Sequence, residues 1–420
     1  MKKNSLFNRV YGTVAIMFFI VATCSFFACS KDDDTPPPVV SPYVESRTVM
    51  VYMVAENSLS SNATNDVQEM LVGMNNDTLS VNDRLVIYLD DVKLPRIYVV
   101  DNTTKKTSLS DLTPVVTYEE DVNSASAEQL GAFVDYVKTH YPAESYGLVM
   151  WSHASGWIPS SYYGDRSSKA SAVRKAFGVD NGKNISNKYS GNNGHQMDIA
   201  DMAGVLEGES FDFIFFDACV MQTIEVAYEL RHVTNCLIAS PAEIPAPGAN
   251  YQTMVKAMFS KEYVAMRIMK DYEREYRSSY GLVISAVNTG ALDDYATYMK
   301  SVVTRHRSEM MELDVSSMLN YIHYGTWTTQ YPDFLDMQGI MLKVLDEEEM
   351  ARWKAETEKV VTCMHAGYWY SDYPKGKVTI DDAQCCGMSM FIPFEKYASS
   401  SWAFNDEYLK TSWAKAVWIE

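Results

Sequence analysis

The sequence predicts an α/β protein with a mainly parallel β-sheet flanked by helices, followed by a C-terminal α+β extension. Apolar runs alternate with segments of helical spacing from residue 46 to 290, as consecutive βαβ units require. The run at 48–54 is apolar almost throughout, which is typical of a parallel strand buried on both faces. Residues 291–420 alternate helical segments with one late apolar run at 388–392. We interpret them as an extension packed on the main domain.

Each element follows from its own local pattern. Runs rich in apolar and β-branched residues predict strands at 48–54, 84–89, 146–151, 211–216, 236–239 and 282–287, and a hairpin partner at 96–100. Apolar residues three and four positions apart predict helices at 61–74, 126–140 and 220–231. Residues 158–198 fit neither pattern, because Ser, Gly, Asn, Lys and Arg dominate there. A segment of that length without elements is either functional or mobile.

The N-terminal segment predicts export. Residues 1–28 begin with basic residues and continue with an apolar stretch at 14–27, which is too short for a comfortable transmembrane span. The stretch ends in Ala28 and Cys29, and this ending resembles the lipobox of bacterial lipoproteins. The resemblance implies a signal peptide at 1–28, lipidation of Cys29 and a membrane anchor through that lipid. A plain secretory signal with an incidental cysteine is the alternative.

A charged, proline-stiffened tether is predicted at 29–45. It contains three consecutive aspartates and three consecutive prolines. An acidic run directly after the lipidated cysteine resembles the surface-export signal of Bacteroides-type lipoproteins. That resemblance implies a lipoprotein of the outer membrane or the cell surface.

Composition and cysteine content narrow the classes of function. The formal net charge is −18, whereas nucleic-acid phosphates require a basic surface, so no nucleic-acid partner is expected. Seven cysteines are present, at positions 24, 29, 219, 236, 363, 385 and 386. Five of them follow Cys29, and an odd number leaves one thiol unpaired even where disulfides form. No spacing of cysteines and histidines predicts a zinc site.

Two segments, 151–157 and 217–221, lie where predicted strands end. In open α/β sheets, ligands bind outside the carboxyl ends of the strands. Cys219 would lie between a strand and the N-terminus of the helix predicted at 220–231, where the helix dipole and free N–H groups favour a thiolate. His153, at the end of a neighbouring strand, would accept the thiol proton and later protonate the leaving amine.

The same two segments supply candidates for an oxyanion hole. These are the backbone N–H groups of Ala154, Gly156 and Cys219, and a glycine gives the loop freedom to turn its amides inward. Taken singly, each residue has a simpler interpretation. A cysteine after an apolar strand is usually a small buried residue, and Asp217 before a helix is most simply an N-cap. The two motifs in this order favour the catalytic interpretation.

The residues around both motifs resemble the clostripain family of cysteine peptidases, which have the caspase-like fold. The segments that match the family lie at 49–53, 56–59, 151–153, 156–157, 217–221, 225–231 and 239–240. The resemblance implies a caspase-like peptidase domain at 46–290 that hydrolyses peptide or protein substrates. It also implies a Cys–His dyad, with His153 as the base and Cys219 as the nucleophile of a thioester intermediate.

The resemblance also bears on specificity. Family members cleave after Arg or Lys, using acidic side chains at the base of the S1 pocket, and Asp217 corresponds to one of these. The second acid usually lies in a stretch that here reads Ile-Pro-Ala-Pro-Gly-Ala at 244–249. That stretch contains no acid, and Glu243 is displaced from it. Ala154 stands where the family has glycine, and a methyl group is tolerated there unless the backbone needs a positive φ.

Activation and cofactor needs follow the same comparison. Family members are often activated by self-cleavage between the histidine and the cysteine. Basic residues that offer such a site are Arg166, Lys169, Arg174 and Lys175, in a segment where nicking is easiest; a loop that is never cut is the alternative. No cofactor or metal is expected. The resemblance to the clostripain family also raises calcium, on which clostripain depends. Acidic clusters lie at 90–91 and 119–121, but no EF-hand loop is present. Calcium is therefore the weaker alternative.

The leading hypothesis is an exported, lipid-anchored cysteine endopeptidase that cleaves after Arg or Lys. The alternative is a catalytically inactive caspase-like surface protein that binds a partner or glycan, which the altered stretch at 244–249 and Ala154 favour. A third hypothesis is a peptidase whose specificity has moved away from basic residues. The sequence gives no indication of the oligomeric state.

Overall fold

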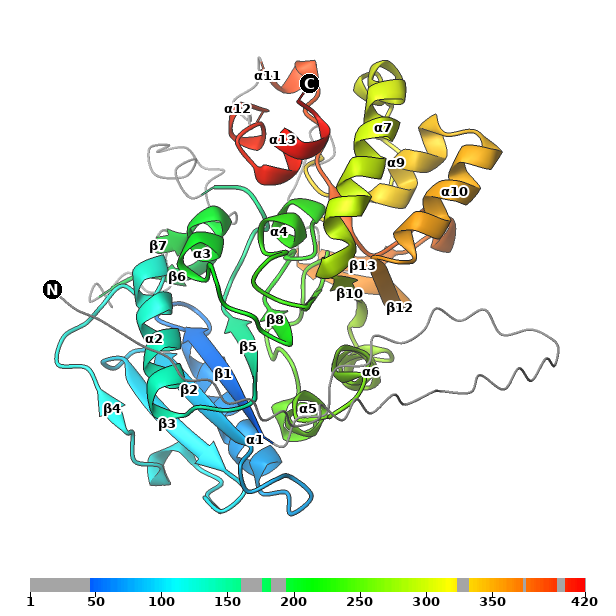
Figure 1. Ribbon diagram of the computed structural model, residues 1–420. Coiled ribbons are helices and arrows are strands. Elements are labelled where there is room, and N and C mark those ends of the chain that lie inside the picture. Colours follow the sequence, from blue (N-terminus) through cyan, green and yellow to red (C-terminus); the bar gives the residue numbers. More distant parts are fainter. Residues whose placement is uncertain are drawn as a thin grey trace, which may run out of the picture. The chain divides into compact units, whose positions relative to one another are not determined.

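The computed structural model describes residues 46–159, 176–182, 194–322, 332–372, 375–398 and 405–419. These residues build a ten-stranded sheet in the order β13-β12-β10-β9-β8-β5-β1-β2-β3-β4 (Figure 1). The strands are β1 (Arg47–Val54), β2 (Arg84–Asp90), β3 (Arg96–Asp101), β4 (Val116–Thr117), β5 (Ser145–Trp151), β8 (Phe213–Asp217), β9 (Cys236–Ala239), β10 (Gly281–Asn288), β12 (Val361–Asp372) and β13 (Lys375–Thr379). Two short antiparallel pairs accompany the sheet, β6 (Phe177–Asp180) with β7 (His195–Met197) and β11 (Leu335–Asp336) with β14 (Ser389–Met390).

The centre of this sheet is parallel and both of its edges are antiparallel. Strands β2, β1, β5, β8 and β9 pair in parallel, and the remaining strands join them in antiparallel pairs. The central strands are apolar because helices cover both faces, and all eight residues of β1 are buried. The predicted α/β fold is therefore confirmed, and the parallel pairing belongs to its central strands.

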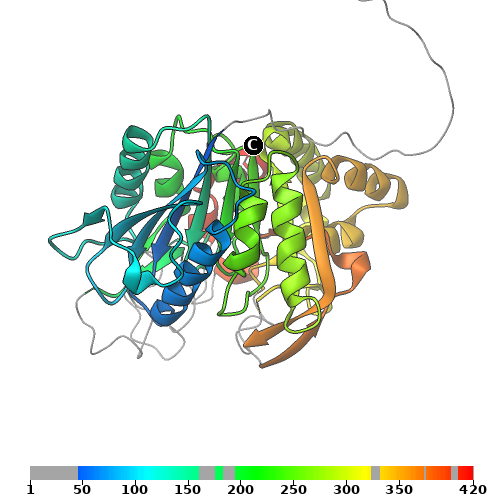
Figure 2. The same cartoon turned by 90° about the horizontal axis from the view of Figure 1, so that it is seen from below.

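Helices cover both faces of the sheet (Figures 1 and 2). Along β1, the side chains of odd-numbered residues from Val49 to Met53 point to the face covered by α1, α5 and α6. Those of even-numbered residues from Met50 to Val54 point to the opposite face. This alternation is the side-chain period of an extended strand. The helices are α1 (Ser60–Met74), α2 (Ala127–His140), α3 (Ile199–Val205), α4 (Ile224–Glu229), α5 (Tyr251–Met258), α6 (Val264–Tyr276), α7 (Leu292–Met311), α9 (Met337–Val344), α10 (Glu347–Thr357), α11 (Glu395–Ala398), α12 (Asn405–Tyr408) and α13 (Ser412–Val417).

Local sequence determines two predicted helices well and a third one poorly. Helices α1 and α2 match the predictions at 61–74 and 126–140, and the hydroxyl of Ser126 caps α2 by accepting from the N–H of Gln129. The helix predicted at 220–231 is wrong at its start. Helix α4 begins only at Ile224 after the cap residue Thr223, because the backbone at Val220 adopts a positive φ of 53°, which no α-helix permits.

The C-terminal residues contribute to the same sheet. β12 and β13 extend it beyond β10 as antiparallel strands, and the sequence analysis did not predict them. Many residues of β12 are only partly buried, so the strand lacks the apolar run that marked the central ones. The late apolar run at 388–392 forms just the two-residue strand β14. Among the described residues, no helix is both long enough and apolar enough to span a membrane.

Candidate functional site

His153 and Cys219 lie at the ends of two neighbouring parallel strands. β5 and β8 pair in register, and their last paired residues are Trp151 and Asp217. Each candidate residue follows its strand by two positions, so both lie at the carboxyl edge of the sheet. Both side chains are partly exposed. The structure therefore places the two predicted residues beyond the ends of paired strands, with both side chains partly open to solvent.

The imidazole of His153 is positioned by a short polar contact. Its Nε2 atom lies 2.9 Å from Oγ of Ser58, a residue of the β1–α1 connection. The backbone is held as well, because the N–H of Gly178 donates to the carbonyl oxygen of His153 and the N–H of Ser155 donates to Ala176, each at 2.9 Å. The loop that carries His153 is thus hydrogen-bonded to β6 and to the residue that precedes it. The sequence analysis missed Ser58 as a histidine partner, although it lies in a stretch that resembled the family.

Cys219 was expected at a helix N-terminus. It lies instead in a tight turn that precedes α4. The turn continues through Val220, whose N–H donates to the carbonyl oxygen of Ala242 at 3.0 Å. Helix α4 starts five positions after the cysteine, so its dipole cannot support the thiolate as predicted. The sulfur instead accepts a hydrogen bond from the N–H of Ile244 at 3.4 Å.

Of the predicted oxyanion-hole residues, Gly156 lies beside the turn that carries Cys219. Gly156 has a φ of +69°, and a Cβ atom added there would lie 3.0 Å from the carbonyl oxygen of Val220. The histidine loop therefore passes directly beside the turn that carries Cys219. Ala154 does not adopt a positive φ, so its methyl group is compatible with the backbone at that position.

Asp217 is buried beneath the cysteine turn and is not a helix cap. Its Oδ2 accepts from the N–H of Ala249 at 3.0 Å and from the hydroxyl of Tyr251 at 2.8 Å. Among the described residues, its Oδ1 has no hydrogen-bond partner. Burial raises the pKa of Asp217 to about 6, and the negative charge of Glu69 adds to the increase while the two hydrogen bonds oppose it.

Two further acids from α1, Asp66 and Glu69, lie near Asp217. Asp66 is 2% exposed and accepts from Nε1 of Trp151 at 2.7 Å. Burial, followed by the charge of Asp217, raises the pKa of Asp66 to about 9. Glu69 accepts from the N–H of Tyr251 at 2.9 Å, and burial also raises its pKa.

The sequence analysis missed both of these acids. A second acid was expected at 244–249, but that loop supplies only backbone contacts to Asp217. A signal was present in α1, because Asp66 shares helical spacing with the buried residues Ala63 and Met70. Glu243 is partly buried beside this loop.

The remaining predicted positions divide into two groups. The candidate self-cleavage residues Arg166, Lys169, Arg174 and Lys175 and the lipidation residue Cys29 lie outside the described residues. Of the two acidic clusters, Asp91 forms an ion pair with Arg96 at 2.6 Å. Its neighbour Asp90 instead approaches Asp121 and Glu56 closely enough for the three to share a cation.

The fold and the site define a class of protein with a cysteine and a histidine at the carboxyl edge of a caspase-like α/β sheet. Comparison with known families agrees with this class. A model described as the clostripain family matches residues 51–419, and the chain therefore belongs to the clostripain family.

Individual relatives are similar over different lengths. Clostripain of Hathewaya histolytica is 28% identical over 225 residues, which are 49% of this chain and 40% of that protein. The match therefore spans less than half the length of that relative. A structure of an inactive zymogen C11 protease from Parabacteroides distasonis is 28% identical, covers 90% of this chain and 99% of its own, and has a TM-score of 0.72. A secreted C11 cysteine protease from Bacteroides thetaiotaomicron, in complex with an irreversible peptide inhibitor, is 27% identical, covers 88% and 98%, and has a TM-score of 0.71.

Proposed function

We propose that the chain is an exported cysteine endopeptidase that cleaves peptide bonds after Arg or Lys. The observation that carries the proposal is the register of β5 and β8, which sets His153 and Cys219 at equivalent positions beyond the pair Trp151 and Asp217. A nucleophile and a base on adjacent strand ends are the arrangement that acyl transfer needs. The relative from Bacteroides thetaiotaomicron, which carries an irreversible peptide inhibitor, supports a peptide as the substrate.

Each catalytic step has a residue to perform it. Since Ser58 holds Nε2 of His153, Nδ1 is the nitrogen assigned to take the thiol proton of Cys219. The sulfur then attacks the substrate carbonyl, and the N–H groups of Cys219, Ala154 and Gly156 receive the oxyanion. His153 returns the proton to the leaving amine, which leaves a thioester on Cys219. Water, deprotonated by His153, hydrolyses the thioester and restores the thiol.

The N–H of Ile244 has a separate role in this scheme. A donor 3.4 Å from the sulfur stabilises negative charge on that atom, because hydrogen bonding to a charged form favours it. It thereby replaces the helix N-terminus that the sequence had suggested. The thiolate is consequently supported by the loop at 244–249 and not by α4.

Uncompensated acids support the preference for basic residues. Asp217, Asp66 and Glu69 lie together, and no described Lys or Arg forms an ion pair with any of the three. A substrate guanidinium or ammonium group supplies the missing positive charge, and charge-assisted hydrogen bonds to carboxylates are strong. Asp66 would take the place of the second acid that is absent from 244–249, because a substrate cation beside it would lower its raised pKa and favour its ionised form.

Activation and export complete the proposal. One relative is described as an inactive zymogen, which supports self-cleavage after Arg166, Lys169, Arg174 or Lys175. Another is described as secreted, which supports export. The lipobox-like residues that end in Cys29 support a lipid anchor at that cysteine. Mass spectrometry of the purified chain tests both points. It should show a lipid on Cys29 and a basic cut site that is absent from a Cys219→Ala variant.

The decisive experiment compares Cys219→Ala with Cys236→Ala as a matched thiol control in β9. Fluorogenic peptides that differ only in the residue before the scissile bond (Arg, Lys, Leu or Asp) report activity and preference together. We expect Cys219→Ala to lose roughly a thousandfold or more in turnover, and Cys236→Ala to retain it. Undiminished turnover in Cys219→Ala contradicts the assigned nucleophile, and equal cleavage after Leu and Arg contradicts the assigned specificity.

A further inference from the structure

A pocket of about 180 Å³ opens beside α3 and α4. Its wall is formed by residues 157–159, the start of α3, one side of α4 and residues 407–411. Four lining residues are acids and one is basic: Asp198, Glu225, Glu229, Glu407 and Lys410. Lys410 pairs with Glu407 at 2.7 Å. The pocket is therefore lined by an excess of carboxyl groups.

Glu225 is the most deeply buried of these acids, and one of its oxygens lacks a donor. It is 1% exposed. Its Oε1 accepts from the N–H of Phe391 at 2.9 Å, whereas its Oε2 has no hydrogen-bond partner among the described residues. Burial raises the pKa of Glu225 to about 7, and the N–H of Phe391 opposes the rise. A buried carboxyl oxygen without a donor is costly, and a cation that enters the pocket would supply that donor.

The wall around Glu225 is held in place before any ligand arrives. The two oxygens of Glu229 accept from the N–H and the hydroxyl of Ser412 at 3.1 and 3.0 Å. Trp157 is 6% exposed, and its ring packs against Phe391 and Tyr408 with centroid distances of 5.0 and 5.3 Å. An indole face attracts cations through its quadrupole. The pocket thus combines carboxyl groups with a fixed aromatic wall.

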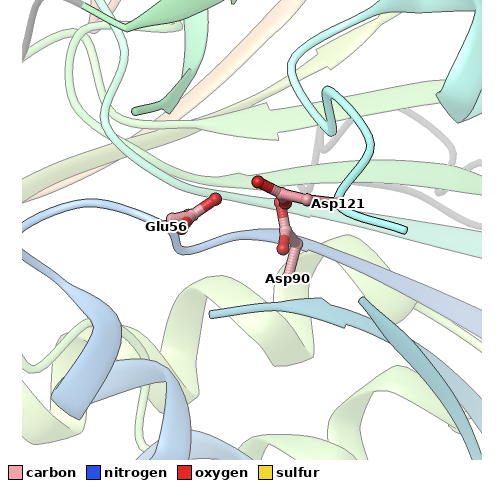
Figure 3. A group of neighbouring side chains, drawn as sticks. All are labelled: Glu56, Asp90 and Asp121. Atoms are coloured by element: carbon pink, nitrogen blue, oxygen red, sulfur yellow. The ribbon is translucent and has the colours of Figure 1, made fainter. Parts of the chain in front are cut away.

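The same wall does not suit a metal ion. Within the described part of the chain, a single trio of His, Cys, Asp or Glu side chains brings its ligand atoms within 4.8 Å of one another. It is the acidic cluster of Glu56, Asp90 and Asp121 (Figure 3), and none of the three lines this pocket. A hard metal ion needs several oxygen ligands at close range, whereas an organic cation uses one carboxylate and an aromatic ring.

We propose that this pocket binds an organic cation, a guanidinium or primary ammonium group on an aliphatic stem. Such a group carries several N–H donors, one of which would reach Oε2 of Glu225 while the stem lies against Trp157. A cavity of about 150 Å³ holds a benzene ring, so 180 Å³ admits a guanidinium group and part of its stem. The cation belongs either to a free small molecule or to an Arg or Lys side chain of a protein.

This pocket is distinct from the acids assigned to the peptidase substrate. Trp157 and Ile224 belong to one hydrophobic core of the sheet, whereas Tyr251, whose hydroxyl binds Asp217, belongs to the core on the other face. Its walls nevertheless come from both segments that carry the proposed catalytic pair, because residues 157–159 follow the histidine loop and α4 follows the cysteine turn. A bound cation would therefore contact both segments without occupying the substrate site.

Calorimetry with butylguanidinium chloride and its neutral isostere butylurea tests the pocket. The full chain carries Cys219→Ala and Asp217→Asn, which remove self-cleavage and the acid assigned to the substrate. At pH 8 we expect one butylguanidinium ion per chain and no binding of butylurea. Glu225→Gln should weaken the binding by about tenfold or more, because a charge-assisted hydrogen bond is lost. The matched control Asp406→Asn removes an exposed acid of α12 that does not line the pocket, and it should bind as the background does.

A second variant and thermal unfolding protect the test against misfolding. Lys410→Met removes the basic residue of the wall and leaves Glu407 for the ligand. It should tighten binding by about two- to fivefold, as expected for the loss of an exposed ion pair, a gain that misfolding would not produce. Butylguanidinium should raise the melting temperature of the background and of Lys410→Met but not of Glu225→Gln. Without ligand, Glu225→Gln should melt no lower than the background, since its amide still accepts from Phe391.

N-acetyl-arginine amide distinguishes the two sources of the cation. Binding of this blocked amino acid with the affinity of butylguanidinium assigns the pocket to an Arg or Lys side chain of a protein. Binding of butylguanidinium alone assigns it to a free small cation.

Three results would overturn the inference. They are no binding of butylguanidinium to the background, equal affinity in the background and in Glu225→Gln, and equal binding of butylurea. Because Asp217 is replaced and no turnover is measured, these results say nothing against the peptidase proposal. Failure of the fluorogenic peptide assay, in turn, leaves the pocket standing.

Discussion

Replacing Asp66 by Asn isolates one buried carboxyl group whose ionisation the fold opposes. Asp66 is 2% exposed, and the ordinary value of its pKa, 3.8, rises to about 9 through burial and the nearby charge of Asp217. A raised pKa means that the folded chain binds a proton that the unfolded chain releases. The free energy of unfolding therefore falls as the pH rises from about 4 to about 9.

The size of this effect follows from the same two values. Each pH unit in that window changes the free energy by about 1.4 kcal/mol, so a rise from about pH 4 to pH 7 corresponds to on the order of 4 kcal/mol. Asn carries no titrating proton, and its side-chain oxygen can still accept from Nε1 of Trp151. We expect Asp66→Asn to remove this share of the pH dependence and to be more stable than the parent at pH 7.

Urea unfolding at pH 5 and pH 8, both in the Cys219→Ala background, measures this difference. Asp135→Asn, on an exposed position of α2, is the matched control for loss of one carboxylate. The reasoning is refuted if Asp66→Asn and Asp135→Asn lose equal stability between the two pH values. The same Asp66→Asn substitution in the active chain should raise KM for Arg substrates, because one acid near Asp217 is lost.

Three other substitutions test the positioning of the site and its supporting sheet. Ser58→Ala should lower kcat about tenfold with KM unchanged, since the lost contact to the imidazole is worth roughly 1.4 kcal/mol; steady-state kinetics measure it. Gly156→Ala should lose about 1–3 kcal/mol in urea unfolding, because Gly156 has a φ of +69° and the added methyl approaches the carbonyl of Val220. Arg47→Met should lose about 3–5 kcal/mol in urea unfolding, because Arg47 is 3% exposed and pairs with Asp212 at 2.7 Å.

The central strands and the adjacency of His153 and Cys219 were predictable from the sequence for one reason. Parallel strands buried on both faces carry apolar runs, and their carboxyl ends must meet at one edge. Strand direction puts both residues at one edge, and the pairing of β5 with β8 makes them neighbours there. β12 escaped prediction because much of it is half-buried, so no apolar pattern marks it.

The turn after Cys219 could not be predicted from local spacing. The apolar residues from Val220 onward fit a helix. The N–H of Val220, however, donates to the carbonyl oxygen of Ala242, which lies in the loop after β9. That tertiary hydrogen bond overrides the local helical tendency and gives Val220 its positive φ of 53°. The acids at Glu56, Asp90 and Asp121 were unpredictable as a group for a similar reason. Only the pairing of β1 with β2 and the path of the following loop bring them together.

The connection from β1 to α1 and the first two turns of α1 carry three residues of the site and its surroundings. Glu56 belongs to the acidic cluster, Ser58 contacts His153, and Asp66 lies beside Asp217. Asn57 fixes this connection, because its side chain is buried and bonded to both β1 and β6. Ser58 and Asp66 are therefore held by one stretch of backbone, which links the position of the His153 imidazole to that of the acids beside Asp217.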